Sequence, residues 1–161
     1  MGARTTAREA ALQMLFAIET TSSDVEQAIS DFWRELPGDA EGREYADQLV
    51  RGVRADAEKL DQRIRAASQN WRLERMARID RNALRLGAYE LLTRTDVPRA
   101  VILDEAVELA KRFGSEESSK FVNGVLDRIA DDLGRADADA KAKAKASADA
   151  DAETNAGGEP S

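Results

Sequence analysis

Apolar residues between positions 76 and 133 recur at helical spacing in three successive stretches. A period of about 3.6 residues places the apolar residues of each stretch on one face of an α-helix. The connections contain residues that begin or end helices, Pro98 after the first stretch and Gly114-Ser115 after the second. This region therefore predicts three helices that form the core of an all-α domain. Their apolar residues are Met76, Ile79, Ala83, Leu86, Gly87 and Leu91, then Ile102, Ala106, Leu109 and Phe113, then Val122, Val125, Leu126, Ile129 and Leu133.

The residues before position 76 continue the helical pattern. Residues 6–9 (Thr-Ala-Arg-Glu) and 23–26 (Ser-Asp-Val-Glu) each fit a capping box and predict a helix that begins at the first of these residues. Apolar residues also stay in phase over 41–68, which fits either one long helix or two helices divided near Gly52. The whole pattern predicts a compact helical bundle of about six to seven helices.

Composition narrows the chemistry that this bundle could perform. The 161 residues are 42% hydrophobic and 34% charged, and they include no Cys and no His. Disulfides, thiolate nucleophiles, histidine bases and most zinc sites are therefore excluded, and we expect no cofactor and no metal. Because the formal net charge is -7, any nucleic-acid site must be a local patch. No apolar run is long enough to span a bilayer and no signal-peptide pattern is present, so we expect a cytoplasmic protein without a membrane partner.

The composition changes near residue 135. From there onward the chain has no apolar side chain larger than Ala, and it is rich in Ala, Asp and Lys. Such a segment cannot bury enough surface to offset the entropy of ordering it. We therefore predict a folded domain over 1–134 and a disordered C-terminal tail over 135–161.

Two charged residues fall on or beside apolar faces. Glu90 lies on the apolar face of its helix, where an isolated charge would be costly, so it either pairs with a cation in the fold or makes a functional contact. Arg8 extends the apolar face of the first helix. It either snorkels at the edge of the domain or contacts a phosphate together with Arg4, one turn earlier.

Other residues favour either packing or binding. Arg78, Arg81 and Arg85 share one side of a helix, where they could pair with neighbouring carboxylates or contact RNA phosphates. Phe121 stands about a quarter-turn from the apolar face of the last helix and follows Lys120, an arrangement that fits a base-stacking site or a marginal core position.

Two glycines inside helices also need an explanation. Gly87 and Gly124 each destabilise a helix by about 1 kcal/mol relative to Ala. We expect a second helix or chain to approach closely at both.

Several separate blocks of this sequence resemble one protein family. They read RTTAREAALQMLF over 4–16, DRNALRLGAYEL over 80–91, DVPRAVILDEAVELAKRFG over 96–114 and KFVNGVLDRI over 120–129. In order and spacing, these blocks are similar to those of the bacterial transcription antitermination factor NusB family, and the resemblance covers roughly residues 4–133.

The resemblance implies a fold of two helical subdomains and a function without catalysis. A member of this family would bind the boxA element of nascent RNA together with the ribosomal protein NusE. It would be tethered to RNA polymerase with other Nus factors and would promote antitermination, notably in ribosomal RNA operons.

The resemblance also implies which residues bind. It places two sets of residues at the interfaces and implies neither a catalytic nor a metal-binding residue. Phe16 replaces the Tyr that is usual in the family, so it offers no phenolic hydrogen bond. The set on the RNA side is Arg4, Arg8, Gln13, Phe16, Lys120 and Phe121, and the set on the NusE side is Asp80, Tyr89 and Glu90.

Three alternatives stand beside this function: part of a methyltransferase, a metal-dependent enzyme and a structural homodimer. The same fold occurs at the front of certain ribosomal RNA methyltransferases, but nothing after residue 134 could form a catalytic domain. Carboxylates at Asp104, Glu105 and Glu108 could in principle hold a metal, although helical carboxylates at this spacing are usually solvated. The protein could be a monomer or a homodimer.

Overall fold

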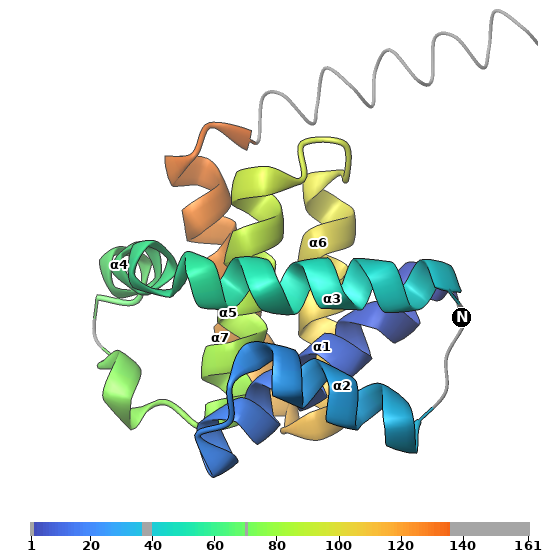
Figure 1. Cartoon of the computed structure of the whole chain (residues 1–161). Coiled ribbons are helices and arrows are strands. Elements are labelled where there is room, and N and C mark those ends of the chain that lie inside the picture. Colours follow the sequence, from blue (N-terminus) through green and yellow to red (C-terminus); the bar gives the residue numbers. More distant parts are fainter. Residues whose placement is uncertain (1, 37–39, 70, 136–161) are drawn as a thin grey trace, which may run out of the picture.

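The computed structural model of the chain describes residues 2–36, 40–69 and 71–135. Within these ranges the chain forms seven α-helices and one short 3-10 helix, and it forms no strand. The predicted all-α bundle of six to seven helices is therefore confirmed (Figure 1). The elements are α1 (Ala3–Thr21), α2 (Val25–Glu35), α3 (Ala40–Ala55), α4 (Ala57–Ala67), η1 (Leu73–Arg75), α5 (Arg78–Thr93), α6 (Arg99–Phe113) and α7 (Glu116–Asp132).

The helices form two groups around one core. Helices α1, α2 and α3 pack against one another, and α4 to α7 form the second group. Helix α5 contacts both groups, because it packs on α1 and α3 as well as on α4, α6 and α7. In Figure 1, α3 lies across the bundle of α5, α6 and α7. This arrangement confirms the two predicted subdomains. No helix in the described ranges is long and apolar enough to cross a membrane.

The first two helices begin at residues other than those that the sequence predicted. Helix α1 begins at Ala3, so Thr6 is not its cap; the Thr6 hydroxyl instead donates back to the carbonyl oxygen of Gly2 at 3.3 Å. Helix α2 begins at Val25, and its cap is Asp24, not Ser23. The Asp24 carboxylate accepts the backbone N–H of Gln27 at 3.2 Å.

The segment 40–67 forms two helices, and the break between them does not fall at the glycine. Helix α3 continues through Gly52 to Ala55, and α4 begins after Asp56. Gly52 instead allows a side chain of α5 to pack closely against α3. The ring of Tyr89 from α5 lies so close that a Cβ at Gly52 would stand 2.1 Å from it. A side chain here would displace the ring of Tyr89.

The two glycines singled out in the sequence have different surroundings. A Cβ at Gly87 would lie 2.5 Å from a methyl group of the buried Leu126, so the expected close approach of a second helix is confirmed there. At Gly124 the expectation of a nearby helix is wrong within the described chain, because a Cβ would meet nothing within 4 Å.

The folded region extends to Arg135. This side chain is buried and donates to the carbonyl oxygens of Leu91 at 3.1 Å and Val97 at 2.6 Å. It therefore holds the connection between α5 and α6. The prediction of a disordered tail concerns 136–161, which lie outside the described residues.

A buried cluster of polar side chains joins the two groups of helices. Arg8 and Glu90 are 3% and 2% exposed, and the guanidinium of Arg8 donates to both carboxylate oxygens of Glu90 at 2.7 Å. The Tyr45 hydroxyl donates to the same carboxylate at 2.7 Å, and Arg8 also reaches Glu105 at 3.0 Å. The cluster thus connects α1, α3, α5 and α6, and it confirms the alternative in which Glu90 pairs with a cation inside the fold.

The surroundings of Arg8 favour its charged form. Burial by itself lowers the pKa of Arg8, but the hydrogen bonds and the charge of Glu90 outweigh burial and raise it. Bidentate geometry gives such a pair both strength and a defined orientation. Removing one partner would leave the other charge buried without compensation.

We expect Arg8→Met to destabilise the protein by about 3–5 kcal/mol, because the Glu90 carboxylate would then be buried without its guanidinium. Urea denaturation followed by circular dichroism measures this loss. Arg4→Met is the matched control: Arg4 is largely exposed and 3.6 Å from Asp96, so its ion pair contributes about 1 kcal/mol or less. Equal urea midpoints for the two variants would contradict the structural role of Arg8.

The phenol of Tyr45 should make stability depend on alkaline pH. Burial, followed by the charge of Glu90 and the hydrogen bond to it, raises the pKa of Tyr45 to about 12, against about 10 in an unfolded chain. The folded state thus holds the proton more tightly, and its contribution to stability is complete below about pH 10 and disappears as the pH rises toward about 12.

We therefore expect the difference in unfolding free energy between the parent protein and Tyr45→Phe to shrink between about pH 10 and 12. Urea denaturation at a series of pH values measures it. Tyr89→Phe controls for the other tyrosine of the chain. A difference that stays constant over this range would refute the assignment.

Candidate RNA and partner surface

The predicted RNA-side residues of α1 do not form one spot. Arg4 lies at the start of the helix and pairs with Asp96 in the α5–α6 connection. Phe16, which is 39% exposed, comes twelve residues later, or about 18 Å along the helix, where Arg78 of α5 lies over its ring. Gln13 is exposed beside a groove that also includes Trp33 of α2. Arg4 and Gln13 are nine residues apart and therefore lie on opposite faces of α1, so a ligand that contacts all three residues must wrap around the helix as well as extend along it.

Arg8 and Glu90 do not lie on the surface as expected. Arg8 neither snorkels at the domain edge nor reaches solvent, because its guanidinium is held by Glu90 and Glu105. Glu90 accepts from Arg8 and Tyr45 in the same cluster and presents no oxygen to a partner. Both predicted binding residues are therefore part of the fold, and their effect on any interface comes through the position of the helices.

The residues predicted for the protein partner do not share a surface either. Asp80 and Tyr89 are nine residues apart on α5, which places them on opposite faces of the helix at about 100° per residue. Tyr89 packs over Gly52 of α3. Asp80 instead lines a hollow at the start of α5, and its buried Oδ1 has no hydrogen-bond partner within the described chain.

The arginine stripe of α5 mostly pairs with carboxylates. Arg81 and Arg85 donate to Glu19 of α1 at 2.9 and 2.7 Å, and Arg85 also donates to Asp61 of α4. Both arginines are largely buried. The alternative of structural pairing is therefore confirmed for these two residues, whereas Arg78 remains half-exposed.

Phe121 is half-buried and meets an aromatic residue that the sequence analysis did not select. Trp71 lies in the connection between α4 and η1 and is 61% exposed. Its ring contacts Phe121 edge to face, with centroids 6.0 Å apart and an angle of 71° between the planes. Trp71 was missed because it belongs to no helical apolar stripe. A tryptophan in a short polar connection was the one available signal.

These two rings form a ridge, here called the aromatic ridge, between two depressions. On one side is the Asp80 hollow, and on the other the Gly124 groove. Both are lined by Trp71 and Phe121. The hollow is completed by Arg75, Met76, Ala77, Asp80, Ser115, Glu117 and Ser118. The groove is completed by Ala67, Ser68, Gln69, Lys120, Gly124, Val125 and Arg128.

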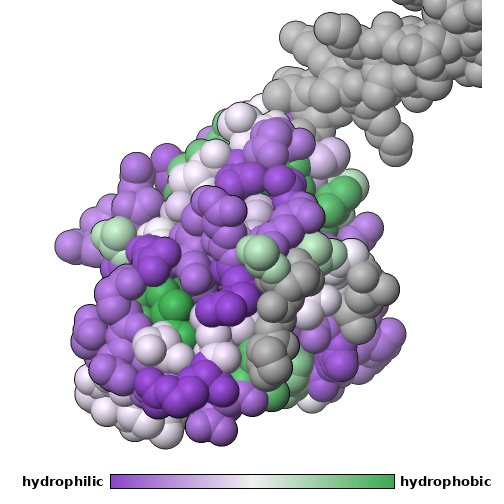
Figure 2. All heavy atoms as spheres, turned by 45° about the vertical axis from the view of Figure 1, so that its right-hand side comes forward, coloured by the Kyte–Doolittle hydropathy of each residue, from purple (hydrophilic) through white to green (hydrophobic). Residues whose placement is uncertain are grey.

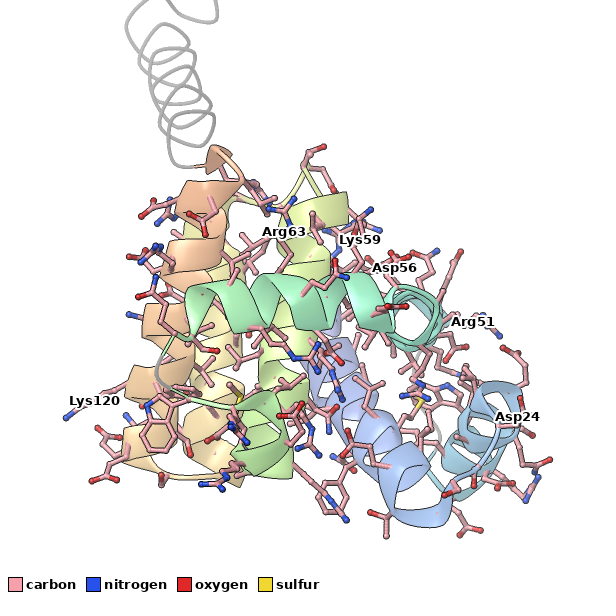
Figure 3. All side chains as sticks on the ribbon, turned by 90° about the vertical axis from the view of Figure 1, so that its left-hand side faces the viewer. Asp24, Arg51, Asp56, Lys59, Arg63 and Lys120 are labelled. Carbon is pink, nitrogen blue, oxygen red and sulfur yellow. The ribbon has the colours of Figure 1, made fainter. Side chains whose placement is uncertain are left out.

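The two depressions differ in what they can bind. The Asp80 hollow is lined by a carboxylate, a group that accepts hydrogen bonds from Arg, Lys or amide donors. The Gly124 groove offers two exposed cations, Lys120 and Arg128, beside an aromatic face. Figure 3 shows Lys120 projecting outward from α7.

Figure 2 shows another face of the molecule. On the face that comes forward in Figure 2, hydrophilic residues predominate and the apolar atoms form small separate patches. Broad apolar contact is therefore not a property of that face.

A small helical bundle with a polar surface and one aromatic ridge flanked by cations and by an unpaired carboxylate belongs to the class of proteins that bind other macromolecules through their surfaces. The sequence model of the NusB family matches residues 5–131 of this chain. This match covers most of the chain, which therefore belongs to the NusB family.

Similar proteins agree with this assignment. Transcription antitermination protein NusB of Sorangium cellulosum (strain So ce56) is 69% identical over 137 residues, which cover 85% of this chain and 98% of that protein. A solved structure of T. maritima NusB is 41% identical with a TM-score of 0.74, and it covers 80% of this chain and 90% of its own. A crystal structure of the antitermination factors NusB and NusE in complex with dsRNA is 28% identical with a TM-score of 0.75, covering 81% and 98%.

Proposed function

We propose that this protein is a noncatalytic transcription antitermination factor that binds single-stranded boxA RNA together with NusE. Membership of the NusB family supports a role in transcription antitermination. The observation that carries the RNA part is the aromatic ridge beside Lys120. Unpaired bases stack on exposed aromatic rings, and a neighbouring cation can contact the phosphates.

RNA binds along a path that combines both ends of α1 with α7. In this proposal Phe121 stacks a base and Lys120 contacts the backbone. Arg4, Gln13 and Phe16 contribute further contacts along α1. Arg8 acts only by fixing α1 against α5, since its guanidinium is occupied by Glu90.

NusE binds at the Asp80 hollow. Its contribution is a cationic or amide donor that pairs with the carboxylate of Asp80, which lines the hollow. Tyr89 contacts NusE only if the interface also reaches the opposite face of α5. The complex is then tethered to RNA polymerase with other Nus factors and suppresses premature termination in ribosomal RNA operons.

The proposal is tested by titrating a labelled boxA RNA with the protein, with and without NusE, and following fluorescence anisotropy. A duplex of the same sequence is the comparison, because paired bases cannot stack on the ridge. We expect the single strand to bind more tightly than the duplex, and most tightly with NusE present. If the protein ignores single-stranded boxA RNA even with NusE present, the proposal fails.

Phe121 and Lys120 should affect RNA binding in different ways. We expect Phe121→Ala to weaken binding by about 1–3 kcal/mol through lost stacking, with an unchanged salt dependence. Lys120→Gln should instead lower the slope of log K against log salt by about 0.7, because one phosphate contact is lost. Anisotropy titrations at several salt concentrations measure both. Identical salt slopes for Lys120→Gln and the parent protein would remove Lys120 from the RNA side.

Asp80 should matter for the partner protein. We expect Asp80→Lys to weaken NusE binding at least tenfold in isothermal titration calorimetry, because a donor from NusE would meet a like charge. Glu58→Lys, an exposed reversal of the same kind on α4, is the control. Circular dichroism verifies that both variants remain folded. Unchanged affinity in Asp80→Lys would place the NusE interface elsewhere.

A further inference from the structure

Gly124 is a glycine that the fold itself does not require. It lies inside α7, where Gly is less favourable than Ala. At Gly87 an added Cβ would collide with Leu126, but at Gly124 it would meet no atom within 4 Å. The reason for a glycine at this position must therefore lie outside the described chain. A glycine at the surface of a helix allows a ligand to approach the backbone closely.

The position of Gly124 on α7 indicates the charge of such a ligand. Lys120, Gly124 and Arg128 follow one another at intervals of four residues, so they lie along one side of the helix. The two cations stand one turn before and one turn after the glycine, and both are exposed. Arg128 also lies 3.7 Å from Asp132 on its own helix, a solvent-exposed ion pair of the kind that contributes little. The described lining of the groove includes no carboxylate.

The opposite wall of the groove is an aromatic face held in place. Phe121 supports the ring of Trp71 edge to face. The backbone N–H of Trp71 donates to the carbonyl oxygen of Ser68 at 2.7 Å. The buried hydroxyl of Ser68 in turn donates to the carbonyl oxygen of Ile64 at 2.7 Å. These bonds anchor Trp71 to the end of α4 while most of its ring remains in solvent.

We propose that the Gly124 groove binds one unpaired nucleotide of the RNA, with its base stacked on Trp71 and its edge against the backbone at Gly124. Lys120 and Arg128 contact the phosphates on either side of that nucleotide. This inference rests on the proposed function, and it adds Trp71, Gly124 and Arg128 to the RNA side. The aromatic ridge then separates the RNA groove from the hollow for NusE.

A Gly124→Ala variant provides the sharpest test, because it should stabilise the fold and yet weaken the binding of RNA. Its thermal midpoint should rise, since Ala favours the helix and fits the open space. Its affinity for fluorescein-labelled single-stranded boxA RNA in the presence of NusE should fall about fivefold or more. Asn123→Ala is the matched control. Asn123 is the exposed neighbour on α7 and should leave RNA affinity unchanged.

Substitutions of Trp71 test the stacking itself. Trp71→Ala should lower the affinity for the same RNA by about 5- to 150-fold, the range that loss of one stacked base produces. Trp71→Phe keeps an aromatic face and should retain most of the affinity. In a Trp33→Phe background Trp71 is the sole tryptophan of the chain. Saturating RNA should then quench its fluorescence, whereas unchanged emission would overturn the inference.

The outcomes separate this inference from the proposed function. If the parent protein with NusE does not bind the RNA, the proposed function itself is wrong. If the parent protein binds but Gly124→Ala and Trp71→Ala bind equally well, only the groove assignment is wrong. If these variants instead lose affinity for NusE in calorimetry without RNA, the groove is a protein interface and the inference is overturned.

Discussion

The arrangement of this bundle depends on one buried ion pair, Arg8 with Glu90. The pair joins α1 to α5, and its further bonds to Tyr45 and Glu105 extend the connection to α3 and α6. Apolar contacts have little directionality of their own, whereas a bidentate ion pair adds a defined orientation to the packing of these helices. The surfaces of α1 and of α5 to α7 are thereby held in a defined relation, and a ligand that crosses from one to the other meets a preformed site.

The same kind of charge pairing removes several arginines from the surface. Arg8, Arg81 and Arg85 face carboxylates of neighbouring helices, so most of their charge is compensated inside the fold. Exposed cations such as Lys120 and Arg128 act in a chain whose formal net charge is -7. Long-range attraction of RNA is therefore weak, and affinity must depend on short-range contacts such as stacking. A partner protein bound next to the RNA would add to those contacts.

Much of the fold followed from periodicity, but contacts between distant residues did not. The three C-terminal helices and the need of Glu90 for a partner were predictable, because both depend on spacing within one helix. The identity of that partner was not, since Arg8 is 82 residues away in the chain. The sequence left open whether residues 41–68 form one helix or two divided near Gly52, and the break at Asp56 could not be located from it, because Gly52 is explained by its contact with Tyr89 on another helix.

The candidate site was predicted less completely than the fold. That Asp80 and Tyr89 lie on opposite faces could have been read from their nine-residue separation. Trp71 could not have been placed, because a residue in a connection has no periodicity to reveal what it faces. Only the structure brings it beside Phe121.

The bonds of Arg135 fix the last residue that the structure describes beside the α5–α6 connection. This position lies at the end of α7 opposite to the end that bears Lys120 (Figure 1). A dye or a biosensor surface coupled directly behind Arg135 would therefore stand away from the aromatic ridge. Immobilised in this way, the protein would present its ridge to the flowing solution.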